Sequence, residues 1–400
     1  MKINNEGSQP CDQIIDSKEL FFLSDEEKKL YKKHDDKYEK IPLWSKIALI
    51  VAAISVILYI IICISPTFAD IFNEYIGGFF RFIFAQLTNV LPFSLSEAAL
   101  MLSPIILFLI IRYVWKYRCN TRRATIVTLV CILSVSLSFL SSFILTFSAG
   151  YRGTELDEKL GIKTEKINKY DLYNTAEYLV EQINELAPTV DYGSDGFSIM
   201  PYTFNEMNDK LIDAYKIFAD EHDFVNSFYS RIKPVLLSKA MSYAHITGIY
   251  TYFTGESNVN VEFPNYTIPY TAAHELSHQR GIAREDEANM MAFLVSLCSD
   301  DTYIRYCAYV NMYEYVANAL YKSDKEMFRE IDQKLDQRVI NEQLAYSAFF
   351  KKYSQSITSQ VSGTVNDIYL QSQGTEGSKS YGMVVDLTVA YLKNLGKIAK

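Results

Sequence analysis

The chain has 400 residues, of which 49% are hydrophobic and 22% are charged, and its formal net charge is −8. This composition argues against an intrinsically disordered protein and leaves room for a folded domain beside membrane spans. The negative net charge argues against nucleic acid as a partner. So does the sequence itself, in which no basic stripe occurs outside the segments that flank the apolar runs.

Residues 1–46 are polar and charged, and we expect an uncleaved cytoplasmic tail, because the stretch is too long and too charged to begin a signal peptide. Apolar segments that are long enough to cross a bilayer follow at about 47–65, 92–111 and 124–149. None of the three carries a charge at mid-depth, which argues against a transporter or a channel.

The distribution of positive charge predicts the topology. Only Arg81 lies between the first two spans, whereas basic residues precede the first span and follow the second. These flanking residues are Lys28, Lys29, Lys32, Lys33, Lys37, Lys40, Lys46, Arg112, Lys116, Arg118, Arg122 and Arg123. Because cytoplasmic flanks are enriched in Lys and Arg, we expect the N-terminus inside the plasma membrane and residues 151–400 outside it. The aromatic segment 72–91 would then lie along the outer interface or pack on the exterior domain.

The exterior part, residues 151–400, is predicted to be mainly helical. The expected helices cover 170–187, 203–221, 223–245, 266–280, 285–298, 301–321, 324–338, 340–361 and 380–395. Segment 246–265 differs, because its β-branched and aromatic residues alternate and are interrupted by Gly255 and Pro264, which indicates one or two short strands. The two exterior cysteines, Cys298 and Cys307, are either a disulfide or a pair of thiols.

The pattern H-E-x-x-H at His274–His278 is the strongest chemical signal in the chain. On a helix, residues four apart share one face, so both imidazoles can bind one metal ion. Glu275 lies beside the first ligand, where its carboxylate can take a proton from a water activated by the metal. Pro269 suits the first turn of that helix and Gly281 suits its end, so the sequence predicts a helix of the right length.

A second helix after Gly281 supplies the remaining candidates. Glu285 and Asn289 are spaced i, i+4, so Glu285 can be the third ligand of a Zn²⁺ ion while Asn289 orients a ligating histidine. Glu287 is the competing ligand, although it points to another side of the helix. The stretch resembles the second helix of the gluzincin zinc peptidases, E-x-x-A-D, with Asn289 in place of the aspartate. It is unlike the metzincins, whose third histidine is replaced here by Arg284.

Four more residues are candidates for contacts with a substrate or an oxyanion. Glu256, Asn258 and Asn260 lie in the predicted strand region, where they either face the cleft or serve as turn residues. Tyr381 precedes the last helix, and its phenol either donates a hydrogen bond to a developing oxyanion or packs in the core.

The order of these motifs resembles an uncharacterised bacterial membrane family, the domain of unknown function 3810, which is grouped with the gluzincin-type peptidases. The resemblance covers about residues 45–395 and rests on P-F-S-L-x-E at 92–97, F-T-G-E-S-N-V-N at 253–260, the metal motif at 274–289 and S-Y-G-M-V-V-D-L at 380–387. It implies three transmembrane helices followed by a mostly helical, zincin-like domain. It names no substrate.

These observations favour a membrane-anchored zinc metallopeptidase that hydrolyses peptide bonds of a peptide or protein substrate outside the cytoplasm. The expected organisation is a tail at 1–46, a membrane domain at 47–150 and a metallopeptidase-like domain at 151–400. The alternative is a pseudoprotease that binds peptides or partners without hydrolysis, an alternative suggested by Asn289 in place of an acid.

Overall fold

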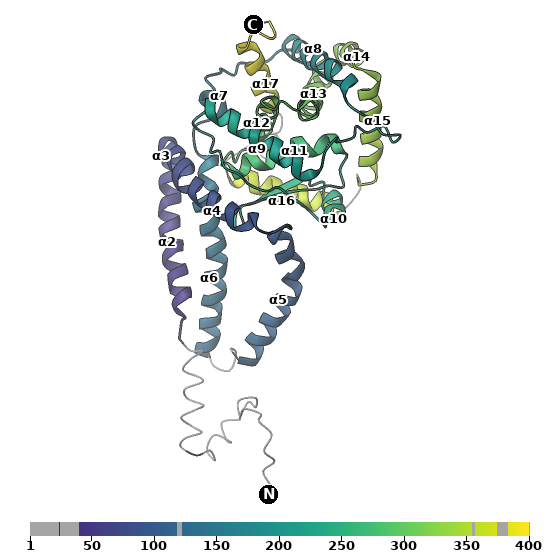
Figure 1. Ribbon diagram of the computed structural model, residues 1–400. Helices are drawn as coiled ribbons and strands as arrows, with labels where there is room; N and C mark the ends of the chain where they lie inside the picture. Colours follow the sequence, from purple (N-terminus) through teal and green to yellow (C-terminus); the bar gives the residue numbers. More distant parts are fainter. Residues whose placement is uncertain (1–23, 25–39, 118–121, 354–356, 374–382, 400) are drawn as a thin grey trace. The chain divides into compact units, whose positions relative to one another are not determined.

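The computed structural model describes residues 24, 40–117, 122–353, 357–373 and 383–399, and these are mainly helical with one small sheet (Figure 1). The chain divides into two compact units, Met1–Val51 with Pro104–Ser138, and Ala52–Ser103 with Phe139–Lys400.

Three helices are long and apolar enough to cross a membrane: α2 (Leu43–Ile64), α5 (Leu95–Tyr117) and α6 (Arg122–Thr146). They overlap the three predicted spans. Many of their large apolar side chains are exposed, among them Ile57 and Leu107, which suits lipid better than water. The chain is therefore associated with a membrane. Within the first unit, the hydroxyl groups of Ser45 and Ser134 lie 2.7 Å apart and join α2 to α6.

The segment between the first two spans forms α3 (Pro66–Ile71), the π-helix η2 (Phe72–Gly77) and α4 (Gly78–Asn89). On α4, Gly78, Arg81, Ala85 and Thr88 are buried at helical spacing, so one face of this helix packs on the rest of the second unit. The opposite face remains apolar and exposed.

Helices build most of the remaining second unit. In order they are η3 (Ser148–Tyr151), α7 (Leu156–Lys159), α8 (Lys169–Leu186), η4 (Ala187–Thr189), α9 (Phe204–Glu221), α10 (Ser238–Tyr243), η5 (Asn265–Thr267), α11 (Ile268–Gln279), α12 (Glu285–Leu297), α13 (Thr302–Ser323), α14 (Lys325–Asp332), α15 (Gln337–Lys351), α16 (Ile357–Ser372) and α17 (Met383–Asn394). Capping boxes at Asn168–Asp171 and Thr203–Glu206 explain where α8 and α9 begin.

A three-stranded sheet lies beside these helices, with the order β1 (Lys233–Pro234), β3 (Glu256–Val259), β2 (Gly248–Thr251). The predicted strands at 246–265 are confirmed as the antiparallel pair β2–β3, in which Gly248 is opposite Val259. The expected helix over 223–245 is wrong, because only α10 is helical there. Lys233 and Pro234 instead pair in parallel with β3, and the buried Lys233 ammonium donates to the carbonyl oxygens of Thr88 and Leu91.

One large apolar cluster forms the core of the second unit, and α11, α12 and α13 run through it (Figure 1). Its members include Leu179, Leu211, Leu276, Phe293 and Val310, each almost fully buried. Cys298 and Cys307 are both free thiols.

Candidate metal centre

The helix α11 that carries H-E-x-x-H is buried on all sides. Pro269 lies in its first turn, and it ends at Gln279, after which Gly281 adopts a φ of 98°. Both end signals predicted from the sequence are confirmed. His274 is the one residue of α11 that is not fully buried, so polar groups such as Glu275 and His278 sit inside the core. Polar groups in such a place need partners, which points to a built site.

The next helix brings a carboxylate to the two histidines. The His274 and His278 rings lie 4.6 Å apart, centroid to centroid, at an angle of 89°. The two oxygens of Glu285 lie 3.3 Å from His274 Nε2 and 3.6 Å from His278 Nε2. One ligand atom from each of the three residues falls within 4.8 Å of the others. The structure therefore brings together the two histidines and the carboxylate that the sequence favoured.

Hydrogen bonds at the far side of each ring set its orientation. His278 Nδ1 lies 2.7 Å from the carbonyl oxygen of Ile282, and His274 Nδ1 lies 3.0 Å from Asn289 Oδ1. When each Nδ1 donates its proton to these oxygens, each Nε2 is left facing Glu285, where it can share a proton with the carboxylate or bind a metal ion. Asn289 thus has the position expected of a residue that orients a ligand.

Glu275 lies at the floor of the site with an unused acceptor. Its Oε2 is buried and has no hydrogen-bond partner among the described residues. The side chain packs against the backbone of Gly248 so closely that a Cβ at that position would lie 2.5 Å from Glu275 Oε1. Burial raises the pKa of Glu275 to about 7, which is the range that suits a general base near neutral pH.

Charges in the cluster favour a cation between the ligands. Burial disfavours the charged forms, yet the neighbouring histidines hold the pKa of Glu285 below its ordinary range. Burial lowers the pKa of His278, but the Glu285 carboxylate outweighs it and raises that pKa to about 9. Two imidazoles and one carboxylate are the donor set of many catalytic zinc sites, and the unpartnered Glu275 oxygen beside them would accept a proton from a water. The residues present fit a zinc ion.

The cluster opens into a cleft of about 910 Å³. One wall is β2, which supplies Gly248, Ile249 and Tyr250 and is an edge strand of the sheet. Other lining residues come from α13, α16 and the segment after α6. They include Phe147, Glu314, Tyr315, Asn318, Ser362, Gly363 and Asn366. An exposed strand edge along a cleft can bind an extended peptide by backbone hydrogen bonds.

The remaining predicted residues lie elsewhere. The Glu287 carboxylate accepts a hydrogen bond of 2.9 Å from the Leu156 amide, away from the ligand cluster. The buried Glu256 carboxylate accepts from the amides of Leu95 and Ser96 at the start of α5. Tyr381 is outside the described residues.

Asn258 and Asn260 are also buried, and neither lines the cleft. Asn258 Nδ2 donates to the carbonyl oxygens of Ile249 and Glu256, and Asn260 Nδ2 donates to that of Ile246. These asparagines therefore tie β3 to its surroundings and do not contact a ligand in the cleft.

Phe147 and Tyr315 are among the cleft residues that the sequence argument missed. The Phe147 ring packs edge-on against His278 with centroids 5.7 Å apart, although it follows the third span directly. Tyr315 lines the cleft from α13, and burial, followed by the charges of Glu314 and Glu285, raises the pKa of its phenol. Neither position carries a local signal, because only the tertiary fold brings it to the histidines.

The model of one protein family, described as "Protein of unknown function (DUF3810)", matches residues 71–389, which is more than half of the chain. The protein belongs to the DUF3810 family. The DUF3810 match includes both ligand helices as well as η2 and α4. Comparisons with curated proteins and with solved structures give no match.

Proposed function

We propose that this DUF3810 protein is a membrane-anchored zinc peptidase. The observation that carries the proposal is the buried, unpartnered Oε2 of Glu275 beside the His274–His278–Glu285 cluster, at the floor of a cleft with an edge strand. A purely structural site would have a fourth protein ligand and no free carboxylate next to it. A strand pair before the H-E-x-x-H helix and a third ligand from the next helix also suit a gluzincin-like domain.

The residues have distinct roles in peptide hydrolysis. His274, His278 and Glu285 would hold the zinc ion, which when bound polarises a carbonyl and makes a water more acidic. Glu275 accepts the proton of the attacking water and returns it to the leaving amine. The edge strand β2 aligns the substrate backbone, and the Tyr315 hydroxyl can donate a hydrogen bond toward a developing negative charge.

The positive-charge pattern supports a location in the plasma membrane, with the N-terminus inside and the cleft outside. The three spans would anchor the enzyme, so its substrates would be peptides or proteins that reach the outer surface of the membrane.

The test uses full-length protein in detergent, a broad peptide library read by mass spectrometry, and zinc content measured on the same samples. Wild type should cleave members of the library, whereas Glu275→Gln should keep its zinc and lose about 10²–10⁴-fold in rate. Equal peptide binding by both proteins without cleavage by either would indicate the pseudoprotease. Unchanged cleavage by Glu275→Gln would refute the role of Glu275.

A further inference from the structure

A buried arginine outside the candidate metal centre has no acidic partner among the described residues. Arg81 of α4 is fully buried, and its guanidinium donates at 2.9 Å to Asn73 Oδ1, at 2.6 Å to the Thr146 carbonyl and at 2.7 Å to the Asn73 carbonyl. The Arg280 carbonyl lies at 3.5 Å. Thr146 is the last residue of α6, and Arg280 is the C-cap residue that follows α11. Since the C-terminal end of a helix carries partial negative charge, Arg81 caps both helices at once.

Asn73 of η2 extends this contact to the turn between the ligand helices. Its Nδ2 donates at 3.0 Å to the carbonyl of Gly281. The fit is tight, because a Cβ on Gly281 would collide with the Arg81 guanidinium and lie 2.8 Å from Asn73 Oδ1. Gly281 therefore combines a positive φ with a close approach to the segment after the first span.

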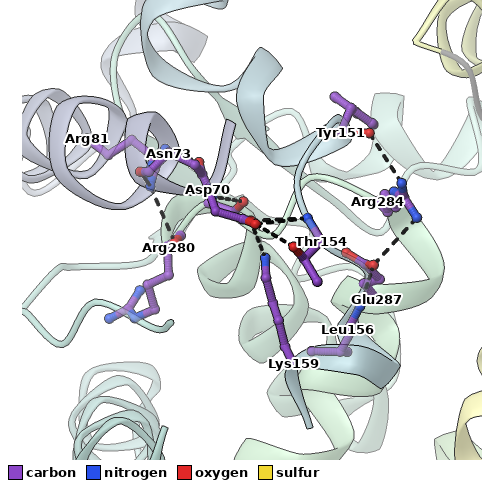
Figure 2. Close-up of polar contacts among 11 residues, drawn as sticks. Asp70, Asn73, Arg81, Tyr151, Thr154, Leu156, Lys159, Arg280, Arg284 and Glu287 are labelled. Carbon is purple, nitrogen blue, oxygen red and sulfur yellow. Dashed lines mark hydrogen bonds and ion pairs between the residues drawn. The ribbon is translucent and has the colours of Figure 1, made fainter. Parts of the chain in front are cut away.

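The same turn is held from its other side by the chain that follows the third span. Arg284 donates at 2.7 Å to Glu155 Oε1. It also donates at 3.4 Å to the Tyr151 carbonyl (Figure 2). Gly150 packs on the Gly281 carbonyl and leaves no room for a side chain. Asp70, in the segment after the first span, also contacts this part of the chain, because its carboxylate accepts hydrogen bonds from the amide and the hydroxyl of Thr154.

The turn leads directly to the candidate ligands. Ile282 follows Gly281, and its carbonyl is the group that orients the His278 ring. Glu285 begins α12 three residues later. A shift of the Gly281 peptide would therefore move the Ile282 carbonyl, which is the hydrogen-bond partner of His278. It would also move the start of α12, which carries Glu285.

We propose that Asn73 and Arg81 are positioning residues for the metal centre, so that metal affinity and coordination geometry depend on docking of the segment that follows the first span. The inference rests on the proposed zinc site and deepens it. It also means that a soluble fragment beginning near residue 151 would lack both side chains, which we call the clamp (Asn73 and Arg81).

A merely structural role would predict loss of stability without a change at the metal, so the test separates the two. The full-length protein in detergent is compared with Arg81→Met, which removes the donors, and Asn73→Asp. Asn73→Asp keeps an oxygen that accepts from Arg81 and adds a negative charge beside the guanidinium. It also replaces the amide donor to the Gly281 carbonyl by a second oxygen. Gln86→Ala is the matched control, because it breaks a bond from α4 to the Tyr229 carbonyl away from the turn. Leu179→Ala lowers stability in the core without touching the clamp.

Two readouts follow the metal itself: zinc affinity by competition with a chelator, and the visible spectrum of the Co²⁺-substituted protein. Arg81→Met and Asn73→Asp should bind zinc about tenfold or more weakly and shift the Co²⁺ bands, as loss of groups that orient ligands does. Hydrogen exchange of the Gly281 and Ile282 amides should also accelerate in the metal-free variants. Gln86→Ala and Leu179→Ala should match wild type in both metal readouts.

Two outcomes would overturn the inference. If Asn73→Asp and Arg81→Met keep wild-type affinity and spectrum, or change them no more than Leu179→Ala does, the clamp does not position the metal. If wild type binds neither zinc nor Co²⁺, the proposed function is refuted, and the inference is refuted with it because it rests on the zinc site. An Arg81→Met protein that does not fold leaves Asn73→Asp to decide the question.

Discussion

Replacement of Gly248 by alanine should disable the proposed general base without removing the metal. A Cβ at this position would lie 2.5 Å from Glu275 Oε1, 2.7 Å from its Cγ and 2.8 Å from Thr271 Cγ2. Ordinary contacts begin near 3.4 Å, so the carboxylate must move by about 0.9 Å (3.4 − 2.5). Gly248 is not among the residues with positive φ, so the backbone itself accepts alanine.

A displacement of about 1 Å at a reacting group costs roughly 10²-fold in rate, or about 2.7 kcal/mol. We therefore expect Gly248→Ala to lower kcat/KM for a fluorogenic peptide about 100-fold, with zinc content unchanged. Gly363→Ala is the matched control, because Gly363 lines the same cleft and a Cβ there meets no atom within 4 Å. Wild-type turnover by zinc-loaded Gly248→Ala would refute the placement of Glu275.

Three further predictions concern the ligands, the topology and the pH dependence of stability. Glu285→Gln should release zinc far more readily than Glu287→Gln, as measured by metal retention on dialysis, because only Glu285 reaches the histidines; the reverse order would contradict the assignment. A reporter that is active only in the cytoplasm should work when fused after Arg123 and fail after Gly161, and activity at both sites would exclude the three-span topology. Burial raises the pKa of Glu314 to about 7, so the folded protein binds a proton that the unfolded chain releases near pH 4.5, and stability falls as pH rises through this window. Glu314→Gln should therefore stabilise the fold more at pH 8 than at pH 5, with a difference in unfolding free energy of up to about 3 kcal/mol less the screening of a partly exposed group. The readout is a larger rise of the apparent Tm at pH 8, and an equal rise at both pH values would contradict the buried charge.

The ligand helices were predictable because their signals are local. Pro269 and Gly281 mark the ends of α11, and the spacing of Glu285 and Asn289 places both on one face of α12. Helical periodicity alone is enough to relate these residues to one another. The same holds for the three apolar helices, whose length and composition are visible in the sequence.

The surroundings of the cluster were not predictable, because they depend on long-range pairing. The sequence gives no sign that Lys233 and Pro234 form a strand, and this strand makes β3 central in the sheet. All four residues of β3 are consequently buried, so its polar side chains serve neighbouring backbone groups. Similarly, the sequence shows Arg81 only as the single basic residue between the first two spans, whereas the fold places it under the ends of two helices.

The most direct test of a metal centre at His274 and His278 is the zinc content of the purified full-length protein. Elemental mass spectrometry should find about one zinc ion per chain in wild type after exposure to zinc and removal of excess metal. The double variant His274→Ala/His278→Ala, compared under the same conditions, should contain almost none while keeping its helical circular dichroism. Equal zinc in the two proteins, or none in a folded wild type, would contradict the account.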